Sequence, residues 1–183
     1  MKLMIGIAGK KRSGKDTVAN YLVNGYRGFS KESFAEPIRN FVCQILGITL
    51  PELELCKEIP QPKFGDVTPR HMMQTLGTEW GRKMVDDQLW MKALAARTSY
   101  KERIAICDVR FENECEWIRQ QGGWIIHLRR PETDSAGDEH ESEKTLDVKL
   151  TRGDLVVINQ GTYEDLEKNV KWALEIITAR MNR

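Results

Sequence analysis

Seven residues near the start of the chain have types and spacing suited to holding phosphate. Gly9 to Lys15 reads Gly-Lys-Lys-Arg-Ser-Gly-Lys, which matches the pattern G-x-x-x-x-G-K. Glycines let the backbone turn so that successive N–H groups point inward, and the lysine adds a full positive charge. The pattern therefore predicts a loop that binds the β- and γ-phosphates of a nucleotide, with an ordinary glycine turn as the alternative.

The segments on either side are those that a phosphate-binding loop requires. Leu3–Ala8 is apolar on both faces, which is typical of a buried parallel strand covered by helices. After the loop, Val18, Tyr21 and Leu22 recur at helical spacing. The order strand, loop, helix favours the phosphate-binding interpretation over a simple turn.

One residue departs from the usual pattern. Asp16 follows Lys15, where Ser or Thr usually holds magnesium, and Thr17 comes next. Three interpretations stay open: Asp16 contacts the metal through water, Thr17 takes a phosphate, or carboxylates elsewhere hold the metal. Asp108 is such a carboxylate, because it follows the apolar run Ile104–Cys107 and ligands gather where parallel strands end. A helix-capping role is the alternative for Asp108.

Strands and helices are predicted to alternate along the whole chain. Further strands are expected at Glu32–Ala35, Arg103–Asp108, Trp124–Leu128 and Leu155–Ile158. Helices are expected at 36–46 and 51–57, from Thr68, from Asp86 or Asp87, at 113–121 and from Thr162. The helix that begins at Thr68 should bury Met72, Met73, Leu76 and Trp80. The alternation predicts an α/β fold, a five-stranded parallel sheet with helices on both faces.

Composition narrows the functional classes. The 183 residues suit a single domain. With 28 basic and 27 acidic residues the net charge is +1, which argues against a general nucleic-acid binder. No apolar run approaches the roughly 20 residues that span a membrane. The four scattered cysteines are typical of reduced thiols in a cytosolic protein.

Four motifs together resemble one known family. They are Gly-x-Lys-x-Ser-Gly-Lys-Asp-Thr (9–17), Ser-Phe-Ala-x-Pro-Ile-Arg (33–39), Arg-His-Met-Met-Gln-x-Leu-Gly-Thr-Glu-Trp-Gly-Arg (70–82) and Asp-Val-Arg-Phe-x-Asn-Glu (108–114). This combination resembles the phage-type deoxynucleoside monophosphate kinases, which belong to the P-loop nucleoside monophosphate kinase superfamily. The resemblance runs to about residue 160. Parts of it also resemble dephospho-coenzyme A kinase and the animal-type phosphomevalonate kinase.

The resemblance implies a fold and an activity. It implies one P-loop NTPase domain with its core at about 1–34, 103–129 and 150–183, a helical acceptor-binding region at about 35–100 and a short lid at about 130–147. The implied activity is ATP-dependent phosphorylation of deoxynucleoside monophosphates to diphosphates by direct in-line transfer, with ATP and Mg²⁺. A kinase of another small acceptor, such as dephospho-coenzyme A, is the alternative. A nucleotide-binding regulatory module is disfavoured, because the chain has no guanine-selecting Asn/Thr-Lys-x-Asp motif after a strand.

The resemblance also implies the partners, the oligomeric state and the location of the protein. The substrates would be small molecules, without nucleic-acid or membrane partners, and the chain would act as a monomer or homodimer. The location would be cytoplasmic, in the host cell if the protein is phage-encoded.

The resemblance and the chemistry of the side chains assign roles to four sets of residues. The catalytic set is Lys15, Asp108, Arg110 and Arg130. The ATP-binding set is Gly9, Lys11, Arg12, Ser13, Gly14, Lys15, Asp16, Thr17, Arg129, Asn159 and Gly161. The set for the acceptor monophosphate is Lys10, Ser33, Phe34, Arg39, Arg70, Gln74, Gly77, Trp80, Arg110, Asn113 and Glu114. The candidate metal ligands are Asp16 and Asp108.

Two further groups have competing interpretations. The aromatic residues Phe34, Trp80, Trp90 and Phe111 could stack on a base, although helical spacing with Ala93 and Leu94 favours core packing for Trp90. The acidic stretch at His140–Glu143 suggests a metal site, but this composition is more typical of a solvated loop.

Overall fold

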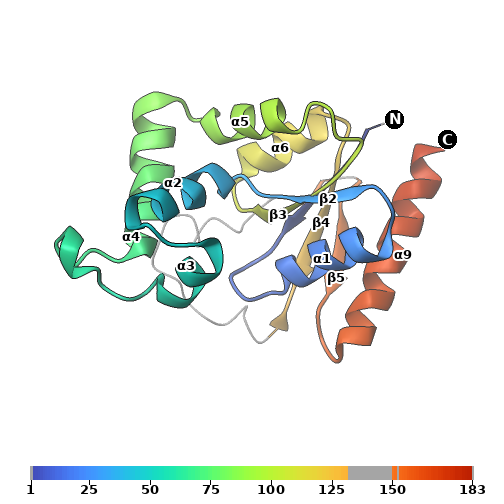
Figure 1. Cartoon of the computed structure of the whole chain (residues 1–183). Helices are drawn as coiled ribbons and strands as arrows, with labels where there is room; N and C mark the ends of the chain where they lie inside the picture. The colour runs from blue at the N-terminus through green and yellow to red at the C-terminus, as the bar shows by residue number, and fades with distance from the viewer. Residues whose placement is uncertain (1, 132–149, 152, 183) are drawn as a thin grey trace. The chain divides into compact units, whose positions relative to one another are not determined.

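The described residues form two compact units. The computed structural model describes residues 2–131, 150–151 and 153–182, so most of the predicted lid (130–147) and the His140–Glu143 stretch lie outside the described residues. Residues 34–97 make the smaller unit, and the segments before and after them make the larger one (Figure 1).

The larger unit is built on a five-stranded sheet in the order β2-β3-β1-β4-β5. Its strands are β1 (Leu3–Ala8), β2 (Phe29–Glu32), β3 (Arg103–Val109), β4 (Trp124–Arg129) and β5 (Leu155–Ile158). All four pairings are parallel, so the carboxyl ends of the five strands lie along one edge. The predicted α/β class and the parallel five-stranded sheet are confirmed.

Helices cover both faces of this sheet (Figure 1). The helices α1 (Lys15–Gly25) and α9 (Tyr163–Met181) share one core with alternate strand residues such as Ile5 and Ile7. On the other face α6 (Glu112–Gln120) packs on β1 and β4, and its Ile118 is fully buried. None of the helices in the described residues is both long enough and apolar enough to cross a bilayer.

The second strand does not lie where the sequence predicts it. We expect it at Glu32–Ala35, but β2 ends at Glu32 after pairing with β3 from Phe29. Phe29 supplies the inward apolar side chain, while the other inward residue is Glu32, whose carboxylate pairs with Lys101 at 2.5 Å. Because a charged side chain occupies a buried position, the strand lacks the apolar alternation on which the prediction depends.

The smaller unit consists of helices. They are α2 (Glu36–Leu46), α3 (Leu50–Cys56), the 3₁₀ turn η1 (Pro62–Phe64), α4 (Pro69–Gln74), the π-helical segment η2 (Thr75–Val85) and α5 (Leu89–Arg97). As predicted, α4 begins at Pro69, and the Thr68 hydroxyl accepts a hydrogen bond from the His71 amide at 3.2 Å. A small core forms around Val42, Cys43 and Leu53.

The helix after Thr68 changes character at Thr75. Eleven residues, Thr75–Val85, are π-helical, so the chain turns more widely than the 3.6-residue period assumes. The prediction that Trp80 is buried is wrong: Trp80 is 45% exposed. Its side chain does share one side of the helix with Met72 and Leu76, but that side lines an open groove instead of a buried core.

Candidate functional site

The loop between β1 and α1 holds the Lys15 ammonium. Nζ of Lys15 donates hydrogen bonds to the carbonyl oxygens of Gly9 at 2.6 Å and Lys10 at 2.7 Å. Lys15 is only 9% exposed. The Ser13 amide donates to the Lys10 carbonyl at 3.2 Å, which closes a tight turn. The loop thus curls around its own lysine.

Gly14 joins the loop to α1 in a conformation that other residues rarely adopt. Its φ is 101°, in the left-handed region, and it forms the N-terminal cap of α1. A Cβ atom here would lie 2.7 Å from Nδ2 of Asn159. That amide donates to the Ser13 carbonyl at 2.8 Å, and the Asn159 backbone N–H donates to the Arg129 carbonyl at 2.8 Å. Asn159 therefore ties the loop to the ends of β4 and β5.

The Ser13 hydroxyl is buried within the loop. Ser13 is 1% exposed, and its Oγ has no hydrogen-bond partner among the described residues. A buried hydroxyl without a partner costs about 1–3 kcal/mol. An oxygen of a bound anion would satisfy it.

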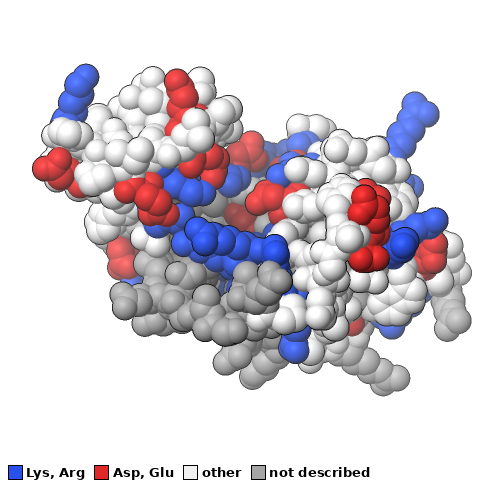
Figure 2. Space-filling model, turned by 90° about the horizontal axis from the view of Figure 1, so that it is seen from below, with Lys and Arg blue, Asp and Glu red and all other residues white. Residues whose placement is uncertain are grey.

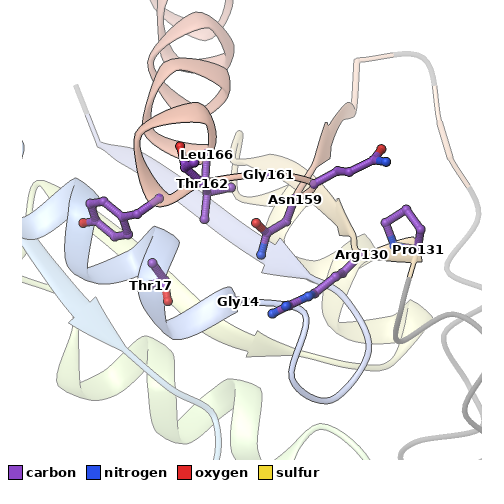
Figure 3. A pocket seen from close by; sticks show the side chains of 10 residues that line it. Gly14, Thr17, Arg130, Pro131, Asn159, Gly161, Thr162 and Leu166 are labelled. Carbon is purple, nitrogen blue, oxygen red and sulfur yellow. The ribbon is translucent and has the colours of Figure 1, made fainter.

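A cavity of about 280 Å³ opens beside the loop. In Figure 3 the Arg130 side chain extends toward Gly14, and the Asn159 side chain lies close to both. The lining residues come from the loop and α1, the segment after β4, the β5–α9 turn and the start of α9: Gly14, Thr17, Arg130, Pro131, Asn159, Gln160, Gly161, Thr162, Tyr163 and Leu166. The cavity brings together five of the sequence-predicted site residues: Gly14, Thr17, Arg130, Asn159 and Gly161.

Basic side chains near the loop differ in exposure. Arg12 and Arg129 are exposed, whereas Lys10, Lys11 and Arg130 are half-buried. Figure 2 shows lysine and arginine side chains, with acidic ones among them, on the face of the molecule seen from below. The basic side chains of the loop itself are a local surplus that the net charge of +1 averages out.

The ends of β2 and β3 bring a hydroxyl and a carboxylate together. Oγ of Ser33, one residue past β2, donates to Oδ2 of Asp108 at 2.7 Å. Asp108 is half-buried near the end of β3. Ser33 therefore orients a carboxylate at the sheet edge that also carries the phosphate loop.

Asp16 lies in a different environment. Its carboxylate forms an ion pair with Lys31 of β2 at 2.7 Å and is 73% exposed. In the described residues no three His, Cys, Asp or Glu side chains are arranged to hold a metal. Mg²⁺ usually takes one or two protein carboxylates and completes its shell with phosphate and water. Asp108 lies at the carboxyl edge of the sheet, where parallel sheets hold their ligands, whereas the Asp16 carboxylate pairs with Lys31 and is mostly exposed.

Glu114 lies in the first turn of α6 and accepts hydrogen bonds from the backbone just before that helix. Glu114 is 2% exposed, and its Oε2 accepts hydrogen bonds from the backbone N–H groups of Arg110 at 2.7 Å and Phe111 at 3.1 Å. This carboxylate therefore caps α6, and its contact with the acceptor stays a prediction. Arg110 and Asn113 are half-buried beside it.

The smaller unit carries the remaining predicted acceptor residues. Arg70, in the first turn of α4, forms an ion pair with Glu58, while Arg39 and Gln74 are half-buried. Gly77 is buried. Phe34 is 3% exposed and belongs to the buried core, and its stacking on a base stays a prediction. Trp90 is buried as expected.

Trp80 faces a groove that the sequence does not reveal. The groove has a volume of about 560 Å³ and is mainly apolar, and it is lined by Phe64, Val67, His71, Met72, Thr75, Leu76 and Trp80. The helical pattern assigns Met72 and Leu76 to a buried face, so it gives no sign of an opening there.

Three residues of the 280 Å³ cavity lie outside the segments that the sequence indicates for nucleotide binding. They are Pro131, Tyr163 and Leu166. Gln160 and Thr162 belong to the turn after the last predicted strand, which the sequence does indicate. Pro131 and Leu166 show no such local signal, because their place in the cavity depends on the packing of β4 and α9.

The fold and loop define a class of protein. A five-stranded parallel sheet in this order, with a phosphate-binding loop after its central strand, is the P-loop kinase fold. Solved structures of the same fold include a gluconokinase from Sinorhizobium meliloti (TM-score 0.54, 12% identity, 98% of this chain and 95% of that chain covered). Another is shikimate kinase from Aquifex aeolicus (TM-score 0.52, 15% identity, 94% and 96% covered).

Within that class the chain belongs to the deoxynucleotide monophosphate kinase family. The model of this family matches residues 3–52 and 53–170. A protein of Acanthamoeba polyphaga mimivirus, provisionally named a deoxynucleotide monophosphate kinase, is 32% identical over 92% of this chain and 94% of its own length. The deoxynucleotide monophosphate kinase of Enterobacteria phage T4 is 24% identical over 97% and 100%. The predicted family and enzyme class are confirmed.

Proposed function

We propose that this protein transfers the γ-phosphoryl group of ATP to a deoxynucleoside monophosphate in one in-line step, giving ADP and the diphosphate. The observation that carries the proposal is the Lys15 ammonium held in a glycine loop beside a 280 Å³ cavity. Charge repulsion between two anionic substrates is the main obstacle to this reaction. The protein therefore contributes chiefly positioning and charge neutralisation.

On the ATP side, the loop residues Gly9 to Lys15 hold the phosphates in this proposal. Backbone N–H groups at the start of α1 and the Lys15 ammonium supply the positive field, and the unpartnered Ser13 hydroxyl donates to a phosphate oxygen. Thr17, Asn159 and the β5–α9 turn at Gly161 hold the nucleoside in the cavity. Lys11, Arg12, Arg129 and Arg130 add charge around the polyphosphate.

The carboxylate that Ser33 orients is the proposed Mg²⁺ site. Asp108 holds the ion directly or through water, and Asp16 stays paired with Lys31. When bound, Mg²⁺ neutralises part of the phosphate charge and helps to align the transferred group.

On the acceptor side, arginines hold the monophosphate in this proposal. Arg70 and Arg110 can each clamp a phosphate through two parallel hydrogen bonds, with Arg39 and Lys10 as further cations. Ser33, Gln74, Gly77, Trp80 and Asn113 complete the set for the sugar and base. Lys15, Arg110 and Arg130 act on the charge that develops on the transferred group.

The proposed setting is the cytoplasm, where ATP is available. All four cysteines are free thiols in this structure, as is usual for proteins in a reducing compartment. We propose that the enzyme works there as a monomer or homodimer on small-molecule substrates.

A coupled ADP-release assay tests the proposal. ATP and Mg²⁺ are supplied with a panel of deoxynucleoside and ribonucleoside monophosphates and with dephospho-coenzyme A, and the products are identified by mass spectrometry. We expect turnover with at least one deoxynucleoside monophosphate. No turnover with any nucleotide would refute the proposal, and turnover with dephospho-coenzyme A alone would favour another acceptor kinase.

The in-line step has its own test. ATP made chiral at the γ-phosphorus should give product with inverted configuration, because one displacement inverts the phosphorus centre. Retention would indicate two displacements through a phosphoenzyme and would contradict direct transfer.

A further inference from the structure

Two buried glycines in the π-helical segment η2 have close neighbours on other helices. Gly77 and Gly81 are four residues apart. A Cβ at Gly77 would lie 3.0 Å from Cδ1 of Ile38, and a Cβ at Gly81 would lie 2.6 Å from the indole ring of Trp90. Glycine inside a helix costs about 1 kcal/mol relative to alanine, so packing contacts must compensate for it.

Trp90 of α5 makes both a polar and an apolar contact with this segment. Its indole Nε1 donates a hydrogen bond to the Gly77 carbonyl at 2.8 Å. The ring occupies the space that a side chain at Gly81 would need. Trp90 is only 7% exposed. A single side chain therefore contacts η2 at two points one turn apart.

The same side chain lies next to Trp80. The two ring centroids are 6.4 Å apart and the ring planes are inclined by 48°, within the range of favourable aromatic pairs. Trp80 is one residue before Gly81, so the backbone that Trp90 contacts also sets the direction of the Trp80 side chain. π-Helical turns are rare and occur often at functional sites.

We propose that Trp90 is a positioning residue: its hydrogen bond to Gly77 and its ring against Gly81 hold η2 in the π-helical form that presents Trp80 to the acceptor. This inference rests on the proposed function, in which Trp80 belongs to the acceptor site. Trp90 itself is buried and acts only through the segment that it holds.

The first variant removes the donor and keeps an aromatic ring. Trp90→Phe should raise the KM for the acceptor about five-fold, the effect of losing one hydrogen bond of ordinary strength. The KM for ATP and the kcat at saturating acceptor should stay within about two-fold of the parent values, because the phosphate loop does not involve this residue. An unchanged acceptor KM would overturn the proposal.

Two control variants separate positioning from general destabilisation. Leu94→Ala removes a fully buried side chain from the same helix, α5, and should lower the melting temperature without raising the acceptor KM. Trp172→Phe makes the same substitution at an exposed site on α9 and should change neither quantity. An increase in the acceptor KM of Leu94→Ala equal to that of Trp90→Phe would mean that Trp90 contributes only stability.

A double-mutant cycle tests the ring contact. Gly81→Ala places a methyl group where the Trp90 ring lies, so it should raise the acceptor KM by itself. The smaller ring in Trp90→Phe leaves room for that methyl, so the double variant should be less impaired than the sum of the two single effects. Additive effects would show that the ring does not hold η2 at Gly81.

A measurement without turnover distinguishes this inference from the proposed function. Hydrogen exchange of the peptide Thr75–Val85 should be faster in Trp90→Phe than in the parent protein and unchanged in Leu94→Ala. Unchanged exchange in Trp90→Phe would overturn the positioning role even in an active enzyme. If the parent protein phosphorylates no monophosphate, the proposed function fails, and with it the acceptor role of η2.

Discussion

Lys15 is the side chain whose surroundings most clearly indicate its role. Its ammonium is nearly buried and is held by two carbonyl oxygens of its own loop. These hydrogen bonds offset the cost of burying the charge and fix its position in the loop. In the proposed reaction the fixed charge acts on the transferred phosphoryl group.

Replacing Lys15 with methionine should therefore reduce turnover more than stability. Lys15→Met keeps the apolar stem and removes the charge, and we expect kcat to fall on the order of 10²–10³-fold. Turnover and thermal melting by circular dichroism are the measurements. Lys168→Met, at an exposed position on α9, is the matched control and should keep parent activity. Near-parent activity of Lys15→Met would mean that the loop does not act on the transferred group.

Arg70 already has an ion-pair partner in the structure. Its guanidinium pairs with Glu58, whose carboxylate is mostly exposed. Since we assign Arg70 to the acceptor phosphate, Glu58 would compete with the substrate for it. Exposed ion pairs of this kind contribute about 0–1 kcal/mol.

Glu58→Gln should lower the KM for the acceptor, because it removes that competing charge. A pair energy of up to about 1 kcal/mol corresponds to an acceptor KM that is up to about five-fold lower, and kcat should stay unchanged. Steady-state kinetics with varied acceptor checks this, with Glu54→Gln on α3 as a control for lost surface charge. A higher KM in Glu58→Gln would instead place Glu58 among the residues that bind substrate.

The turns at the carboxyl edge of the sheet assemble the site. The strand ends of β1, β4 and β5 meet through Asn159, which bonds to the Ser13 and Arg129 backbones. These three segments are far apart in the sequence, and parallel pairing brings their ends to one edge. Asn159 therefore supports the loop in addition to lining the cavity.

Asn159→Ala should weaken ATP binding. Losing the hydrogen bond to the Ser13 carbonyl should raise the KM for ATP about five-fold and leave the acceptor KM nearly unchanged. Asn169→Ala is a close control, because Asn169 also donates to a backbone carbonyl, that of Ile158, without touching the loop. Equal effects of the two substitutions would show that Asn159 has no special link to the loop.

A buried ionic cluster links secondary structure across the larger unit. Asp154 accepts hydrogen bonds from Arg119 of α6 at 2.7 Å, from the Thr151 amide at 3.0 Å and from His127 of β4 at 3.0 Å. Burial by itself would raise the pKa of Asp154, but these hydrogen bonds outweigh it and hold the pKa below its usual value of 3.8. The cluster joins α6, β4 and the start of β5.

The stability of the fold should accordingly fall in acid. The folded-state pKa of Asp154 is lower than the unfolded value, so the unfolded state binds the proton more readily. The contribution of Asp154 to the free energy of unfolding is complete above the ordinary carboxyl range near pH 4. It is lost as the pH falls through the lower folded-state pKa of Asp154. Denaturant unfolding at a series of pH values between 7 and 3 measures this loss in the free energy of unfolding.

Asp154→Asn provides the comparison. It should be less stable at pH 7 by about 1–3 kcal/mol and should lose less stability on acidification than the parent protein. Glu116→Gln, at an exposed position on α6, should retain the parent pH dependence. The same acid sensitivity in Asp154→Asn and the parent protein would assign the effect to other carboxylates.

Local patterns were enough to predict most of the fold. The apolar run Leu3–Ala8, the glycine–lysine loop and the helical spacing after it identified β1, the loop and α1 from neighbouring residues alone. The helix at 36–46 and the strand at 155–158 were predicted with the bounds that the structure has. Periodicity and glycine placement are properties of a short segment, so they can be read without knowing the fold.

Contacts between distant residues account for what local patterns missed. Glu32 is buried where Lys101 pairs with it, and Asp16 is directed to Lys31. The π-helical segment that carries Trp80 packs against Trp90, and the Trp90 ring lies beside that of Trp80 although it is ten residues further along the chain. Residue types and spacing therefore predicted the family and the enzyme class of this protein. Its site geometry was decided only in the folded chain, because each of these side chains is directed by a partner that its neighbours in sequence do not specify.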